Sequence, residues 1–80
     1  MVEHFYNIQI YKMYIAQNIE FPERFLISPD DYEESWTTDP GLAYKWKSLA
    51  GCKVWCGGCG GGEWKPIEFN GKKLRPATKY

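Results

Sequence analysis

Hydrophobic and polar residues alternate near the start of the chain, in a segment rich in aromatic and β-branched residues. Between residues 4 and 15 the alternation runs through Tyr6, Ile8 and Ile10 and then changes phase at Tyr11. One inserted residue turns the buried side chains of a strand to the other face, so a bulge near Ile10 and Tyr11 explains the change. We therefore expect a long strand over residues 4–15. A helix is the alternative, because apolar residues also recur there at helical spacing.

Several signals for the start of a helix come next. Ser28 can cap a helix, Pro29 suits the first helical position, and the acidic residues after Pro29 complement the helix dipole. Tyr32 and Trp36 are four residues apart and would form the buried edge of such a helix. The pattern predicts a short helix near residues 29–36.

A second helix is predicted near residues 40–50. Asp39 can serve as its cap and Pro40 as its first residue. Apolar residues then recur at helical spacing: Leu42, Trp46 and Leu49. Gly51 comes after them and is typical of a helix end.

The last part of the chain predicts a hairpin. Residues 63–69 alternate, and Asn70-Gly71, a strong hairpin signal, separates them from residues 72–75. Pro66 cannot donate a hydrogen bond to a neighbouring strand, so we expect its strand to be an edge strand or to be bulged there. Residues 53–55 are a further candidate strand.

Together these elements predict one α+β domain over residues 1–80, with a three- to four-stranded antiparallel sheet packed against two short helices. The 80-residue chain holds four Trp, six Tyr and four Phe, and such large side chains favour a folded core. No apolar run is long enough for a transmembrane helix, and the first residues do not resemble a signal peptide. We therefore expect a cytoplasmic protein.

The net charge is zero, but the two halves of the chain differ. Residues 1–43 carry eight acidic and two basic residues, a charge of −6, whereas residues 44–80 carry a charge of +6. This division predicts two surfaces of opposite sign, or two halves that attract each other.

Three cysteines lie close together before a glycine tract: Cys52, Cys56 and Cys59. We expect no cofactor. The alternative is that these three thiols, with His4 as a fourth ligand, bind a zinc ion. Their spacing equals that by which radical-SAM enzymes hold an iron–sulfur cluster, but a chain of this length cannot build the barrel that those enzymes need. The simpler interpretation is structural: Cys52 packs as a small apolar residue just after a helix, and Cys56 and Cys59 are reduced thiols in a mobile loop.

No serine–histidine pair, phosphate-binding loop or paired-carboxylate cleft is present, so we expect no enzymatic activity. One hypothesis is that an acidic and aromatic surface binds a protein, through Asp30, Asp31, Glu33, Glu34 and Trp36. The partner could be a nucleic-acid-binding host protein that the chain inhibits, because short, aromatic-rich chains are typical of accessory proteins of phages and mobile elements.

The second hypothesis is a small zinc or nucleic-acid-binding module. Its nucleic-acid contacts would come from the basic hairpin, through Trp64, Lys65, Lys72, Lys73 and Arg75. Zero net charge makes direct nucleic-acid binding the weaker hypothesis, since nucleic-acid-binding domains are usually basic.

Overall fold

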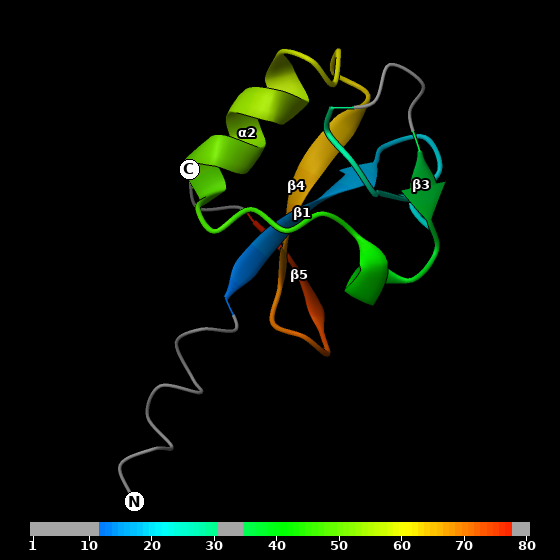
Figure 1. Cartoon of the computed structure of the whole chain (residues 1–80), viewed down its shortest axis with the longest axis vertical. Coiled ribbons are helices and arrows are strands. Elements are labelled where there is room, and N and C mark those ends of the chain that lie inside the picture. Colours follow the sequence, from blue (N-terminus) through cyan, green and yellow to red (C-terminus); the bar gives the residue numbers. More distant parts are fainter. Residues whose placement is uncertain (1–11, 31–34, 78–80) are drawn as a thin grey trace, which may run out of the picture.

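The computed structural model describes residues 12–30 and 35–77, which form one five-stranded antiparallel sheet, one α-helix and a 3₁₀ turn. The sheet order is β3-β2-β1-β4-β5 (Figure 1). The elements in chain order are β1 (Met13–Asn18), β2 (Phe25–Leu26), β3 (Trp36–Thr37), the turn η1 (Pro40–Leu42), α2 (Leu49–Gly57), β4 (Trp64–Phe69) and β5 (Leu74–Pro76). The predicted α+β class and antiparallel sheet are confirmed, but these residues contain one α-helix where two were expected.

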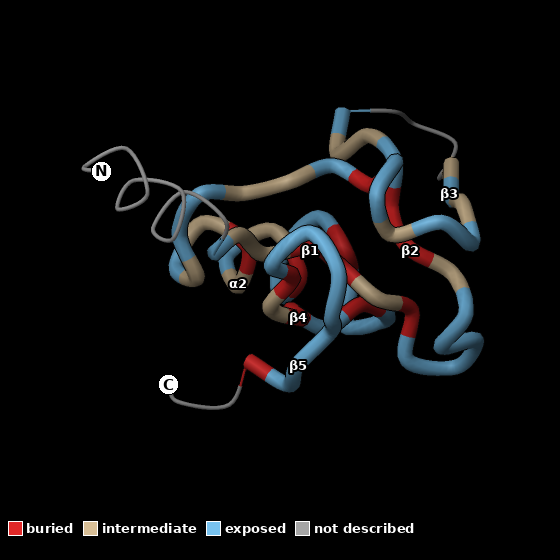
Figure 2. The backbone as a smooth tube through the Cα atoms, turned by 90° about the horizontal axis from the view of Figure 1, so that it is seen from below, coloured by how far each residue is buried: buried red, intermediate tan, exposed pale blue. Residues whose placement is uncertain are grey.

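The ladder between β1 and β4 is the centre of the sheet. It pairs six residues on each strand, from Met13 opposite Phe69 to Asn18 opposite Trp64. Side chains alternate along a strand, so Ile15 and Ala16 face opposite sides. Each side has its own buried cluster, and Figure 2 shows the buried positions along β1, β2 and β4 and within α2.

The helix α2 covers one face of the sheet. Cys52 and Cys56 are four residues apart, which places them on the same side of the helix. Both pack with Ala16, Leu26 and Trp64. The other cluster consists of Ile15, Phe25, Ala43, Ile67 and Phe69. None of the described helices is long and apolar enough to cross a membrane.

The first strand differs from its predicted bounds. β1 continues to Asn18, three residues beyond the predicted end at Ile15, because its polar end still pairs with β4. The predicted start of this strand and its bulge fall in residues 4–11, outside the described part of the chain.

The prediction of a helix near residues 29–36 is wrong at its C-terminal end. Trp36 belongs to β3 and pairs with Leu26 of β2, so a sheet contact replaces the helical turn. The hydroxyl of Ser28, the residue predicted to cap this helix, accepts a hydrogen bond from the Asp30 amide at 3.4 Å. Residues 31–34 are outside the described residues.

The helix predicted near residues 40–50 is wrong beyond its first turn. The Asp39 cap is confirmed, because its carboxylate accepts a hydrogen bond from the Gly41 amide at 2.9 Å. The backbone is already extended at Ala43. Tyr44 then donates to the carbonyl of Leu26, and Trp46 exchanges two backbone hydrogen bonds with Tyr14 of β1. Pairing with the sheet therefore overrides the helical spacing of the apolar residues.

The α-helix begins nine residues later than predicted, at Leu49. Ser48 is its cap, and the Ser48 hydroxyl accepts from the Gly51 amide at 3.1 Å. Gly51 lies in the first turn and does not end the helix. Residues 53–55, predicted as a candidate strand, are helical. One helical turn over these residues places Cys52 and Cys56 on the same side of α2, where both pack against the sheet.

The C-terminal hairpin is confirmed, with a longer turn than two residues. Phe69 pairs with Leu74, so four residues connect β4 and β5. Gly71 has a φ of 97°, and the Asn70 side chain accepts hydrogen bonds from the amides of Lys72 and Lys73.

Pro66 lies in a strand with a neighbour on each side, because β4 pairs with both β1 and β5. The prediction of an edge strand is therefore wrong for β4 as a whole. However, β5 ends at Pro76, opposite Ile67, so Pro66 lies just beyond that ladder. The missing amide of Pro66 interrupts no pair with β5.

Candidate binding site at the β1–β2 turn

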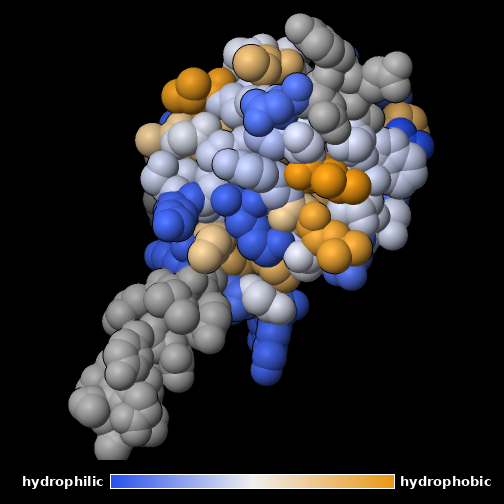
Figure 3. Space-filling model, in the orientation of Figure 1, coloured by the Kyte–Doolittle hydropathy of each residue, from blue (hydrophilic) through white to orange (hydrophobic). Residues whose placement is uncertain are grey.

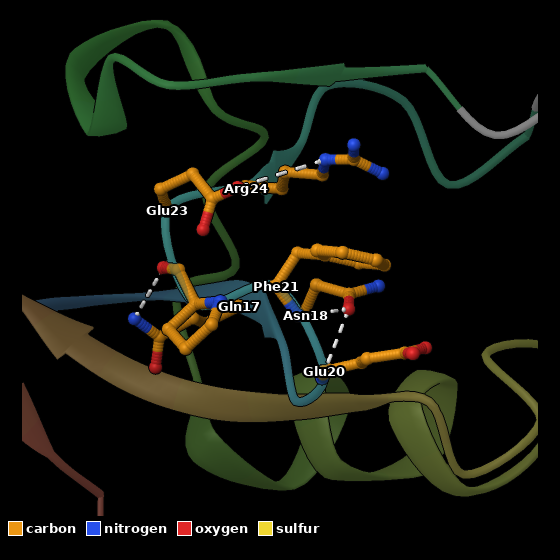
Figure 4. A network of polar contacts seen from close by, with 7 residues as sticks. Gln17, Asn18, Glu20, Phe21, Glu23 and Arg24 are labelled. Atoms are coloured by element: carbon orange, nitrogen blue, oxygen red, sulfur yellow. Dashed lines mark hydrogen bonds and ion pairs between the residues drawn. The ribbon is translucent and has the colours of Figure 1, made fainter.

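A pocket of about 370 Å³ lies at the end of β1, where the turn to β2 meets the segment before β4. We call it the end pocket. Its lining residues are Asn18, Ile19, Glu20, Phe21, Arg24, Gly62 and Glu63. Figure 4 shows the side chains of Asn18, Glu20, Phe21 and Arg24 extending from the β1–β2 turn in the same direction.

Asn18 holds the first wall of the end pocket. Its carbonyl oxygen Oδ1 accepts hydrogen bonds from the amides of Glu20 and Phe21, at 3.0 and 2.8 Å. Its own backbone amide donates to the carbonyl of Arg24 at 2.9 Å, which closes the turn. An asparagine side chain that bonds the backbone two and three residues later is a strong turn former. This wall is therefore fixed by the residues immediately after β1.

The glycine-rich segment after α2 builds the opposite wall. Gly61 and Gly62 have φ values of 62° and 80°, which residues with a Cβ seldom adopt. The tight turn returns the chain to β4 and places Glu63 beside the first wall. The Ile19 amide donates to the carbonyl of Glu63 at 2.9 Å and joins the two walls. The glycine tract is thus explained by geometry rather than by phosphate binding.

Arg24 is held between two aromatic rings. It lies two residues before Leu26, so it projects to the same side of the sheet as Leu26 and its partner Trp36. The guanidinium carbon is 4.2 Å from the ring centre of Phe21 and 4.2 Å from that of Trp36. We call these three residues the aromatic clamp. The guanidinium therefore makes a cation–π contact with each of the two rings.

The hydrogen bonding of Arg24 is incomplete. Its Nε atom is buried and has no hydrogen-bond partner in the described structure, and the carboxylate of Glu23 is 4.0 Å from it. A buried donor without an acceptor is unfavourable. The contacts of the guanidinium with the two rings are favourable interactions of this side chain.

The surface around the clamp combines exposed apolar groups with acidic charge. Ile19 is 52% exposed, Phe21 39% and Trp36 44%. Glu20 and Glu63 line the end pocket and Glu23 pairs with Arg24, so these four charged residues sum to −2. Elsewhere, Figure 3 shows hydrophobic side chains in separate spots among hydrophilic ones on the face drawn.

The predicted protein-binding residues are placed only in part. Trp36 belongs to the aromatic clamp, and Asp30 is exposed. The other three acidic residues of that set, Asp31, Glu33 and Glu34, lie outside the described residues.

In the predicted nucleic-acid-binding set the basic residues are exposed, but the aromatic residue expected to stack on a base is buried. Trp64 is only 3% exposed and packs in the core against α2, so it cannot stack on a base in the folded protein. Its ring is one of a row that continues through Trp55 and Trp46. The basic residues of the set are exposed: Lys65, Lys72, Lys73 and Arg75.

The three cysteines do not converge on one point. Cys52 and Cys56 are buried in α2, and the Cys52 thiol donates to the carbonyl of Ile15 at 3.7 Å, while Cys59 is exposed. The described residues contain no group of three metal-binding side chains, and the fourth proposed ligand, His4, lies outside them. The expected position of Cys52 after a helix, and of Cys56 in a loop, is wrong for both.

The two buried thiols affect each other. The hydrogen bond between their side chains raises the pKa of Cys52, and burial raises it further. The same hydrogen bond lowers the pKa of Cys56, against the effect of burial. The two side chains therefore pack in the same buried cluster of the core.

Sequence reasoning missed most of the end pocket. Arg24 is one of two basic residues in the acidic half of the chain, and this was the available sequence signal that it belongs to a site. Glu63 is more than forty residues from Asn18 in sequence, and only the sheet register brings them together. Comparisons with models of protein families, with curated proteins and with solved structures found no match.

Proposed function

We propose that this domain is a non-enzymatic protein-binding module, and that its contact surface is the aromatic clamp together with the end pocket. The observation that carries the proposal is the clamp itself. Phe21 and Trp36 are both more than one third exposed although they are large aromatic side chains, and the guanidinium of Arg24 lies 4.2 Å from each ring centre. Trp, Tyr and Arg are the residues most enriched at the centres of protein interfaces.

The clamp has the preorganisation that an interface anchor needs. The β1–β2 turn is fixed by the Asn18 hydrogen bonds, and Trp36 is fixed through β3. A partner would therefore meet rings that are already in position, which lowers the entropy lost on binding.

Charge indicates the kind of partner. The net charge of −2 at the clamp and end pocket favours a basic surface and disfavours nucleic acid. Basic protein surfaces often bind nucleic acid, so we favour a nucleic-acid-binding protein as the partner. The domain would inhibit this partner by covering its basic surface.

The test compares two variants in binding to a partner that is first isolated with the tagged domain and then purified. Trp36→Ala removes the exposed ring of the clamp and is expected to weaken binding about 30-fold or more, which corresponds to about 2 kcal/mol at an interface centre. Val54→Ala is the control, because Val54 is 74% exposed on α2. Titration calorimetry gives both affinities, and circular dichroism confirms that both variants fold.

A competition assay tests the inhibitory form. Addition of the domain should release DNA or RNA from the partner. Equal affinities of Trp36→Ala and the parent would overturn the proposal, as would direct, salt-sensitive binding of the domain to nucleic acid through the basic hairpin.

A further inference from the structure

The turn between β4 and β5 brings together the atoms of a reaction. It lies at the end of the hairpin, away from α2 (Figure 1), and its first two residues, Asn70 and Gly71, are both exposed. A bond from the backbone nitrogen of Gly71 to the side-chain carbon Cγ of Asn70 would close a five-membered ring. Such a ring closure is the first step in the deamidation of asparagine, and it needs only water as a further reactant.

Gly71 leaves the approach to Cγ open. A Cβ added to Gly71 would meet nothing within 4 Å, so the space beside its backbone is free. The glycine also has no side chain of its own to crowd the attacking nitrogen. Asn18 is different, because it is buried and is followed by Ile19, whose branched side chain hinders the same attack.

The turn also holds the carbonyl group that is attacked. Oδ1 of Asn70 accepts hydrogen bonds from the backbone amides of Lys72 and Lys73, at 2.9 and 2.8 Å. When the Gly71 nitrogen adds to Cγ, negative charge develops on Oδ1. Two backbone N–H groups at about 2.7–3.1 Å from such an oxygen form an oxyanion hole. These hydrogen bonds strengthen as the charge develops, so they stabilise the intermediate more than the starting amide.

We propose that Asn70 is a modification site, and that the β4–β5 turn accelerates its deamidation. Hydroxide removes the proton of the Gly71 amide, and the nitrogen forms a bond to Cγ. The bond from Cγ to the side-chain nitrogen then breaks, and water returns a proton to this nitrogen as it leaves as ammonia. Water opens the cyclic imide at either carbonyl and leaves aspartate or isoaspartate at position 70. The net change exchanges ammonia for water, and no oxidant or cofactor takes part.

The modification changes the charge of the hairpin. Residues 70–75 carry three basic side chains and no acidic one, so the new carboxylate lowers their charge from +3 to +2. Aspartate keeps the course of the backbone, and its carboxylate can accept from the same two amides. Isoaspartate lengthens the main chain by one carbon between Phe69 and Leu74, which are paired across the hairpin. This chemistry does not depend on the proposed protein-binding function.

The test compares the full-length protein folded in buffer with the same protein unfolded in guanidinium chloride. Both samples are kept in mildly alkaline buffer at equal ionic strength, and mass spectrometry of their peptides locates the modified residue. Because the sequence is identical, the ratio of the two rates isolates the effect of the turn. Asn70 should deamidate about tenfold faster in the folded protein, which corresponds to about 1.4 kcal/mol of stabilisation in the transition state. Equal or slower conversion on folding, or modification of Asn18 before Asn70, would overturn the proposal.

A pair of variants tests the oxyanion hole directly. Lys72→Pro and Lys72→Ala both remove the charge of Lys72, but only proline also removes the backbone N–H that donates to Oδ1. The ratio of folded to unfolded rates should be about threefold lower for Lys72→Pro than for Lys72→Ala. Circular dichroism checks that both variants fold. The same ratio for the two variants would show that the hydrogen bond does not accelerate the reaction.

Discussion

Two glycines near the end of α2 should respond in opposite ways to the same substitution. Gly57 is the last residue of α2, and a Cβ added there meets nothing within 4 Å. A Cβ on Gly60 would lie 2.9 Å from the carbonyl oxygen of Cys56 and 2.9 Å from the Trp55 ring. Neither glycine has a positive φ, so backbone strain does not enter the comparison.

The difference between the two alanine variants isolates the steric contact. Both lose a similar amount of unfolded-state entropy, and Gly57→Ala should therefore stabilise the domain by about 0.4–1 kcal/mol. In Gly60→Ala the overpacking costs about 1–3 kcal/mol against that gain. At about 4–8 °C per kcal/mol for a domain of this size, the two melting temperatures should differ by about 4–24 °C.

Thermal and urea unfolding followed by circular dichroism, in reducing buffer, measures both variants against the parent. Gly57→Ala should melt above the parent and Gly60→Ala below Gly57→Ala. Equal melting temperatures for the two variants would refute the close approach of Gly60 to α2. Because the same segment carries Glu63 to the end pocket, Gly60→Ala should also alter the amide signals of Ile19 and Glu63.

Two further outcomes are expected. Leu26→Ala should destabilise the domain by about 2–5 kcal/mol in urea unfolding, because Leu26 is fully buried against α2, and a loss below about 1 kcal/mol would contradict that packing. Iodoacetamide should alkylate Cys59 in the folded protein and reach Cys52 and Cys56 only in denaturant, as read by mass spectrometry, whereas rapid modification of all three thiols would show that α2 does not cover the sheet.

The hairpin was predictable because its signals are local. The Asn70-Gly71 turn needs no distant partner, and it is present in the structure between the two strands that were expected. The alternation in β4 is only partial, because Pro66 and Ile67 are both buried. The Asp39 cap was predictable for the same reason. The extended segment after η1 was not predictable, because Trp46 pairs with Tyr14, thirty-two residues earlier, and no local signal reports such a pair.

The α-helix was misplaced because its sequence resembles a helix end. Gly51 and Gly57 both lie within α2, and glycine is normally unfavourable in a helix. Tertiary packing compensates, since Cys52 and Cys56 bury their thiols on the sheet. The signal that could have located it is the Ser48 cap together with Cys52 and Cys56 at helical spacing.

The candidate site was harder to predict than the fold. Trp36 was expected both to form the buried edge of a short helix and to belong to a binding surface. The first expectation is wrong, because Trp36 lies in β3 and is 44% exposed. Arg24 and Phe21 could not be identified in this way, because their contact with Trp36 depends on the pairing of β2 with β3. A two-residue strand has too few residues to show alternation in sequence.

The hydrogen bond from Ile19 to Glu63 joins two segments that are distant in the chain, so the end pocket exists only while β1 and β4 stay paired. Occupancy and folding are therefore thermodynamically linked. A ligand present at one hundred times its Kd would raise the free energy of unfolding by about 2.7 kcal/mol. A melting curve thus becomes a way to screen for the natural ligand before its identity is known.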